Sequence, residues 1–267
     1  MSRRIEIAFA RAAKQKRAAF IPYVTAGDPA PGATVGIVRA LERGGADLVE
    51  LGVPFTDPIA DGPTNQRAAE RALAGWTTLG TVLQMVQELR YTSELPVVLF
   101  SYYNPIHAYG LERFAVDAAA VGVDGLLLTD VPVEEARPAW EALRKVGISL
   151  VPLVAPTSTR ARVKAVRKLA SGFVYFVARA GVTGVQDSLA QELEPQVRMV
   201  RKLTGCRVAV GFGISTPDQV HRVARFADGV VVGSAIVDRI ADIGDRPGLT
   251  GEIESFARSL SLATRRR

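Results

Sequence analysis

The chain has 267 residues, of which 48% are hydrophobic and 22% are charged, a composition that excludes a disordered or low-complexity protein. Its 33 Lys and Arg against 27 Asp and Glu give a formal charge of +6. The basic residues are scattered instead of forming a stripe with interleaved aromatic residues, which argues against a nucleic-acid-binding protein.

The sequence pattern contains neither a membrane helix nor a secretory signal. Apolar runs such as residues 126–128 are far shorter than the roughly 20 residues of a membrane helix. The charged N-terminus lacks the apolar segment of a secretory signal. The only cysteine, Cys206, cannot form an intrachain disulfide, which suits a reducing compartment. We therefore expect a cytoplasmic protein that contacts no membrane.

Eight short apolar runs recur along the chain, about 33 residues apart on average. They are rich in Val, Ile, Leu and Phe and do not alternate with polar residues, which is typical of parallel strands buried on both faces. The predicted strands are residues 18–24, 47–51, 96–101, 125–129, 149–153, 173–177, 207–211 and 229–232.

Helical patterns separate these runs, so strand and helix alternate through the whole chain. This repetition predicts one α/β domain over residues 1–267, a single (β/α)8 TIM barrel with an extra helix at the N-terminus. The gap after the second strand, about 44 residues, must hold a long loop and a further helix. An open doubly wound sheet is the alternative. The predicted helices are residues 34–43, 78–90, 111–121, 134–146, 160–169, 193–203 and 217–225.

The loop at residues 50–66 carries three carboxylates among prolines and glycines. Glu50 ends the second strand, where barrel enzymes place catalytic groups, and an apolar setting there would raise its pKa. An exposed or arginine-paired glutamate is the competing interpretation. By the same reasoning, Asp57 and Asp61 are either turn-forming residues or part of a site.

Three glycine-bearing segments follow the sixth, seventh and eighth predicted strands: residues 181–184, residues 211–213, and Gly233 with Ser234. Glycine lets backbone N–H groups approach a ligand closely, and a helix start adds unpaired donors. The pattern indicates a phosphate site with Ser234 as helix cap and phosphate ligand. The alternative is that these glycines only form tight turns.

The loop at residues 50–66 resembles the signature of the tryptophan synthase alpha chain family. The resemblance runs over nearly the whole chain, and its motifs occur in order. They are residues 21–29, 102–105, 130–132, 155–159, 179–184, 210–215 and 233–237.

The resemblance implies a carbon–carbon lyase of tryptophan biosynthesis, which cleaves indole-3-glycerol phosphate to indole and glyceraldehyde 3-phosphate by a retro-aldol reaction. It implies that Glu50 is the general acid and base, and that Asp61 accepts a hydrogen bond from the indole N–H. Tyr175 would help position Glu50, or be a half-buried core residue. The reaction needs no metal or organic cofactor.

The resemblance also implies the binding residues, although barrel packing is an alternative role for each wall residue. Substrate-binding candidates are Tyr23, Phe100, Leu127, Thr129, Tyr175, Thr183, Phe212 and Val231, and phosphate-binding candidates are Gly184, Gly213, Gly233 and Ser234. In the family, residues 179–193 correspond to a lid over the substrate, within which Thr183 contacts Asp61.

In the family, the alpha chain forms an alpha2-beta2 heterotetramer with a beta chain that carries pyridoxal phosphate and receives the indole. The matching interface residues here are Asp57, Asn104 and Pro105. This chain departs from the family at Asn65, which replaces an apolar residue, and at Thr129, which often is alanine. Both changes put polar atoms near the expected indole site.

Three rival functions stay open. The first is a stand-alone lyase that releases free indole, and the second is a non-catalytic activator of a beta chain. The third is another phosphate-binding barrel, such as an isomerase of histidine or pentose metabolism. The two histidines, His107 and His221, do not have the spacing of metal ligands.

Overall fold

The computed structural model describes residues 2–178, 186–211 and 213–266. Its strands form one parallel sheet in the order β5-β4-β3-β2-β1-β9-β8-β7-β6. The strands are β1 (Ala19–Thr25), β2 (Val49–Gly52), β3 (Val97–Ser101), β4 (Gly125–Leu128), β5 (Ser149–Leu150), β6 (Leu153–Val154), β7 (Phe173–Val177), β8 (Arg207–Gly211) and β9 (Gly229–Val232).

The two ends of this sheet order are consecutive in the chain, and this closes the barrel. β5 pairs with β4 and β6 pairs with β7, so β5 and β6 are two halves of the one strand predicted at residues 149–153. The amide of Val151 still bonds to β4, whereas the carbonyl of Pro152 accepts from β7. Proline has no N–H to donate, so the strand is divided there. Eight strand positions result, and the (β/α)8 barrel is confirmed.

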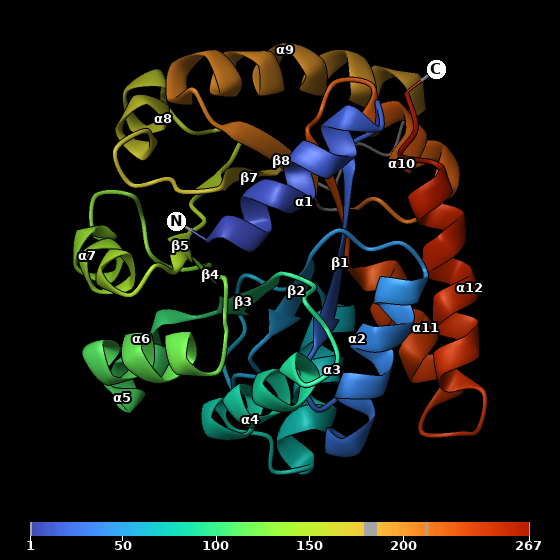
Figure 1. Ribbon diagram of the computed structural model, residues 1–267. Helices are drawn as coiled ribbons and strands as arrows, with labels where there is room; N and C mark the ends of the chain where they lie inside the picture. The colour runs from blue at the N-terminus through green and yellow to red at the C-terminus, as the bar shows by residue number, and fades with distance from the viewer. Residues whose placement is uncertain (1, 179–185, 212, 267) are drawn as a thin grey trace.

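Helices surround the sheet (Figure 1). They are α1 (Arg3–Lys14), η1 (Pro31–Ala33), α2 (Thr34–Arg43), α3 (Pro63–Ala74), α4 (Leu79–Arg90), α5 (Tyr103–Tyr109), α6 (Leu111–Ala120), α7 (Arg137–Lys145), α8 (Arg160–Val166), α9 (Gln186–Thr204), α10 (Pro217–Ala224), α11 (Ser234–Ile243) and α12 (Leu249–Leu262).

The predicted helices are present, with some changes at their ends. α1 and α3 are the expected extra helices, and α5 and α12 go beyond the elements predicted from the sequence. The helix predicted at residues 193–203 begins earlier, at Gln186, so the second half of the expected lid is part of α9.

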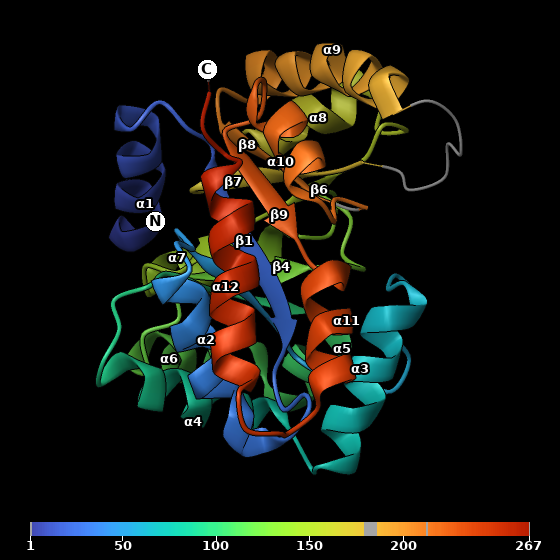
Figure 2. The ribbon, with the colours of Figure 1, turned by 90° about the vertical axis from the view of Figure 1, so that its right-hand side faces the viewer.

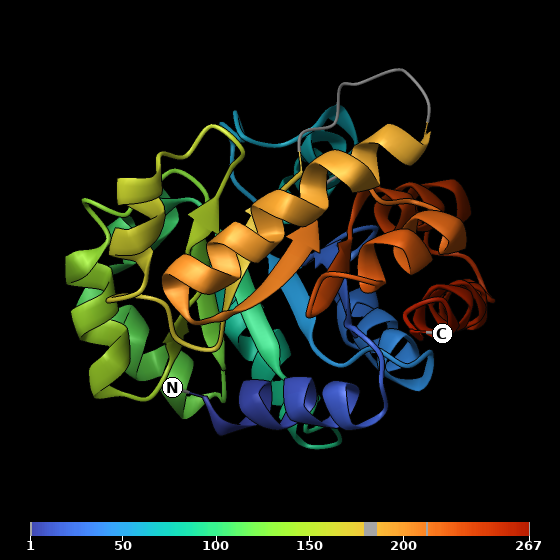
Figure 3. The ribbon, with the colours of Figure 1, turned by 90° about the horizontal axis from the view of Figure 1, so that it is seen from above.

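The core has two layers. The inner layer fills the barrel with side chains such as Ile21, Val98 and Phe173, and the outer layer packs the other face of the strands against the helices. α1 lies across one end of the barrel, opposite α3 (Figures 2 and 3). Ile5 and Phe9 of α1 join the inner layer, with the ring of Phe9 5.2 Å from that of Phe173. This end of the barrel is therefore sealed by α1.

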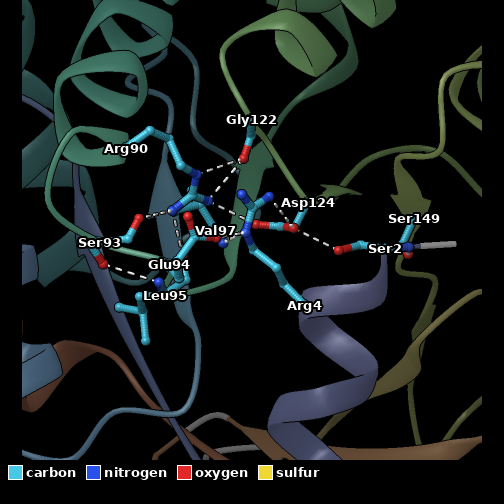
Figure 4. Close-up of polar contacts among 10 residues, drawn as sticks. All are labelled: Ser2, Arg4, Arg90, Ser93, Glu94, Leu95, Val97, Gly122, Asp124 and Ser149. Carbon is cyan, nitrogen blue, oxygen red and sulfur yellow. Dashed lines mark hydrogen bonds and ion pairs between the residues drawn. The ribbon is translucent and has the colours of Figure 1, made fainter.

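Aspartate–arginine pairs fasten this sealed end. Asp124 is 3% exposed and accepts hydrogen bonds from Arg90 (2.8 Å), Ser2 (2.6 Å) and the amide of Val97 (3.0 Å), as Figure 4 shows. Ser2 lies just before α1, so the same carboxylate ties both a strand and the helix to the barrel. Each bond satisfies a buried polar group that would otherwise destabilise the fold.

The arrangement occurs three times. In each case an aspartate that precedes one strand accepts the amide at the start of the neighbouring strand and pairs with an arginine. The sets are Asp47 with Phe20 and Arg17, Asp124 with Val97 and Arg90, and Asp228 with Val208 and Arg201. These three aspartates hold the strand ends in register, and each carboxylate accepts hydrogen bonds from an amide and an arginine.

Candidate active site

Glu50 projects into the barrel from the centre of β2. Its neighbours Val49 and Leu51 are buried in the outer layer, and because side chains alternate along a strand, Glu50 faces inward. It is 1% exposed, and neither carboxylate oxygen has a hydrogen-bond partner among the described residues. Burial raises its pKa to about 8. The competing interpretation of an exposed or arginine-paired glutamate is therefore excluded.

Asp61 lies in the loop between β2 and α3, at the mouth of the same cavity. Its Oδ2 accepts a 2.8 Å hydrogen bond from the hydroxyl of Tyr102, and that hydroxyl in turn accepts one of 2.9 Å from the amide of Ala60. Burial raises the pKa of Asp61, while the hydrogen bonds from Tyr102 and Asn65 oppose the rise. The two carboxyl groups thus differ: Glu50 is unpartnered, and Asp61 is held by donors that favour its charged form.

Two tyrosines, Tyr23 on β1 and Tyr175 on β7, line the cavity near these carboxyl groups. Burial and the nearby acidic groups raise the pKa of both, so both stay protonated at neutral pH. Each hydroxyl lies against a strand glycine: a Cβ on Gly52 would come within 2.3 Å of the Tyr23 hydroxyl, and one on Gly211 within 2.1 Å of that of Tyr175. Only glycine leaves room for these side chains.

The cavity has a volume of about 730 Å³ and opens at the carboxyl end of the strands. Its walls include the rings of Tyr23 and Phe100, which meet edge to face with centroids 5.1 Å apart. An apolar chamber with a few polar groups is typical of a small-molecule site.

The cavity is also lined by Gly213, Gly233 and Ser234, which follow β8 and β9. Gly233 is the N-cap of α11, and Ser234 is the first residue of the helix, so the prediction that Ser234 is the cap is wrong. Gly233 has no side chain to cap with, and its carbonyl accepts from Ile236 and Val237. The amides of the first turn, starting with Ser234, are unpaired within the helix, as a phosphate site requires.

Most of the predicted binding residues come together here. Tyr23, Phe100, Thr129, Tyr175 and Val231 line the cavity. Leu127 does not, which corrects that prediction: it is fully buried in the inner layer with Val98 and Val151.

Thr183, Gly184 and Phe212, together with the expected contact of Thr183 to Asp61, lie outside the described residues.

The predicted interface residues are not part of the cavity lining. Asp57 and Asn104 are exposed and Pro105 is half-buried. Asn104 and Pro105 belong to α5, whose first amide, that of Tyr103, donates 2.8 Å to Asp130 Oδ1.

Tyr102 is the residue that sequence reasoning missed. It lies directly after β3, holds Asp61, and packs against Phe55 at 5.2 Å. Its position at a strand end was the signal that could have identified it.

Comparisons with known proteins agree with this geometry. A sequence model described as tryptophan synthase alpha chain matches residues 9–263. The chain is 51% identical over 247 residues to the tryptophan synthase alpha chain of Solibacter usitatus, which covers 92% of each protein. It is 48% identical to that of Phenylobacterium zucineum, over 98% of this chain and 97% of the relative. The chain belongs to the tryptophan synthase alpha chain family.

A solved structure extends the relationship to three dimensions. The crystal structure of tryptophan synthase subunit alpha from Legionella pneumophila str. Paris matches with a TM-score of 0.91 at 36% identity, over 99% of this chain and 98% of that one. The two polar departures from the alpha-chain pattern, Asn65 and Thr129, both line the cavity.

The described part of the chain shows neither a metal-ligand cluster nor a membrane-spanning helix. No cluster of three or more His, Cys, Asp or Glu there is arranged to hold a metal ion. No helix within the same residues is long and apolar enough to cross a membrane.

Proposed function

We propose that this chain is the alpha subunit of a tryptophan synthase and cleaves indole-3-glycerol phosphate to indole and glyceraldehyde 3-phosphate. One observation carries the proposal: Glu50 is a buried, unpartnered carboxyl group with a pKa of about 8, in a cavity that also holds the hydrogen-bonded carboxylate of Asp61. Two carboxyl groups with different surroundings divide acid and base roles within one site.

In this proposal Glu50 begins protonated and donates its proton to C3 of the indole ring. The positive charge that develops on the ring nitrogen is stabilised by Asp61, which accepts the N–H hydrogen bond. The Glu50 carboxylate then takes the proton of the adjacent glycerol hydroxyl while the carbon–carbon bond breaks. Glu50 gives one proton and recovers one, so the group is restored without an external acid.

The remaining groups bind the two ends of the substrate. Gly213, Gly233, Ser234 and Gly184 hold the phosphate through backbone N–H groups and the start of α11. Tyr23, Phe100, Thr129, Tyr175 and Val231, with Thr183 and Phe212, enclose the indole ring. The support is that the described members of both sets line one cavity.

A beta chain is the partner that the family implies, and pyridoxal phosphate belongs to that beta chain, since alpha chains of this family hold no cofactor. We propose an alpha2-beta2 assembly in the cytoplasm, with Asp57, Asn104 and Pro105 at the interface. The exposure of Asp57 and Asn104 supports this. We also propose that residues 1–267 fold as one domain.

Indole release from purified protein and indole-3-glycerol phosphate tests the activity, with and without a beta chain and alongside Glu50→Gln. We expect slow release alone, a large increase with the beta chain, and a loss of at least about 100-fold in Glu50→Gln. Fast release with no response to the beta chain would identify a stand-alone lyase. No release in either condition would reject the reaction, leaving a non-catalytic activator or a different phosphate-binding barrel.

A further inference from the structure

Two side chains in the cavity present buried oxygen atoms without a hydrogen-bond partner among the described residues. One is Glu50, whose carboxyl group the proposed reaction uses. The other is Asn65, whose Oδ1 has no assigned role. A buried, unpaired acceptor destabilises a protein unless a ligand or function compensates for it, so Asn65 calls for an explanation.

The neighbouring carboxylate determines which way the Asn65 amide points. Asn65 is the third residue of α3, and its side chain lies close enough to Asp61 for hydrogen bonding to lower the pKa of that carboxyl group. An ionised carboxylate only accepts hydrogen bonds, so the NH2 group of Asn65 must face Asp61 and Oδ1 must face away from it. The terminal torsion of asparagine is soft, so a small rotation brings Oδ1 to a donor in the cavity without moving the helix.

Thr129, the other polar departure from the family pattern, does not raise the same question. Its hydroxyl contacts the carbonyl of Ser101 at 3.4 Å and also interacts with Tyr102. Thr129 is therefore satisfied within the protein, whereas Asn65 Oδ1 is not. The cavity that Asn65 lines also has apolar walls, including Phe100 and Val131.

We propose that Asn65 is a specificity-determining residue, which makes the cavity favour indole rings that carry a second hydrogen-bond donor, a hydroxyl or amino group on the benzene ring. The proposal rests on the function proposed above. The ring N–H already has an acceptor in Asp61, so a further acceptor at this end of the cavity fits a further donor on the ring. Because the benzene ring does not react, Asn65 would act on KM and leave kcat nearly unchanged.

The test uses the reverse reaction, in which the purified chain condenses an indole with glyceraldehyde 3-phosphate. Hydroxyindoles are compared with methylindoles substituted at the same ring position (4, 5, 6 or 7), because a hydroxyl and a methyl group are similar in size. For each ring position, kcat/KM of the hydroxyindole is divided by kcat/KM of the methylindole. We expect this ratio to be about 10-fold higher in the natural protein than in Asn65→Leu at one ring position at least. The change should reside in KM.

Two further variants keep the outcome clear. Asn65→Ala removes the same oxygen without adding bulk, so it must lose the preference even if Asn65→Leu folds poorly. Glu70→Gln changes an exposed residue of the same helix, keeps Asn65 and must keep the preference. Ratios that agree within about 3-fold between the natural protein and both Asn65 variants, at all four ring positions, would overturn the proposal. If unsubstituted indole is not converted at all, the proposed function fails, and calorimetric binding of the same indole pairs then tests Asn65 separately.

Discussion

The hydroxyl of Tyr102 donates a 2.8 Å hydrogen bond to Oδ2 of Asp61 and accepts one of 2.9 Å from the amide of Ala60. Tyr102 also precedes α5, the helix that carries Asn104 and Pro105. One side chain therefore joins the proposed catalytic carboxylate to the proposed partner-facing helix.

Tyr102→Phe removes this hydroxyl and keeps the ring contact with Phe55. The hydroxyl lowers the pKa of Asp61, so its loss should raise that pKa and move the acidic limb of the pH–rate profile to higher pH. We expect kcat/KM at neutral pH to fall about 10-fold, the cost of one hydrogen bond to a charged group. The matched control, Tyr103→Phe, changes the next residue along the chain. A profile that does not move in Tyr102→Phe would contradict the role.

The pH dependence of cleavage should report Glu50 directly. Its pKa is about 8, and the first step needs the protonated acid. The pH dependence of kcat/KM reports the pKa values of groups in the free enzyme. We therefore expect kcat/KM to fall as pH rises through about 8, and to fall about 10-fold for each further pH unit. Steady-state rates between pH 6 and 10 measure this, and the residual activity of Glu50→Gln must lack the limb. Activity that stays level up to pH 10 would rule out Glu50 as the acid.

Glu50 should also make the protein less stable at high pH. In the unfolded chain it titrates near 4.5, and in the folded protein near 8. Between these values the folded state holds a proton that the unfolded state has lost, so the free energy of unfolding decreases as pH rises. Glu50→Gln removes this term. In urea unfolding we expect Glu50→Gln to be more stable than the natural protein by about 4 kcal/mol at pH 8, with the difference vanishing near pH 4. A difference independent of pH would contradict the assignment.

The sealed end of the barrel offers a test of stability alone. Asp124→Asn leaves Arg90 half-buried without its charge partner, and we expect a loss of about 3 kcal/mol in urea unfolding. Glu94→Gln is the matched control, because Glu94 is 79% exposed and pairs with Arg4, the other arginine near Asp124. It should change stability by less than about 0.5 kcal/mol. Equal effects of both variants would mean that the buried Asp124–Arg90 pair contributes little to the free energy of unfolding.

The chain order of the fold could be predicted because it depends on local patterns. Apolar runs of four to seven residues and intervening helical periods are local, and they placed β7, β8 and β9 at their observed bounds. The division of the fifth strand at Pro152 was missed, although proline was the signal. α5 was missed because its first amide is paired by Asp130, a residue that lies 27 positions further along the chain. Long-range partners of this kind leave no mark on local periodicity.

Sequence by itself determined which chemical groups are present: Glu50 after an apolar strand, Asp61 in a proline–glycine loop, and glycines at the later strand ends. Only the tertiary structure decided how deeply these groups are buried, which hydrogen bonds they make and how their pKa values shift. Closing the barrel buried Glu50 without a partner and raised its pKa, while the same closure brought Tyr102 from the next strand to Asp61. It also placed Leu127 inside the packed core instead of the cavity. Burial and hydrogen bonding depend on residues that are distant in the chain, and those contacts exist only once the strands have closed into the barrel.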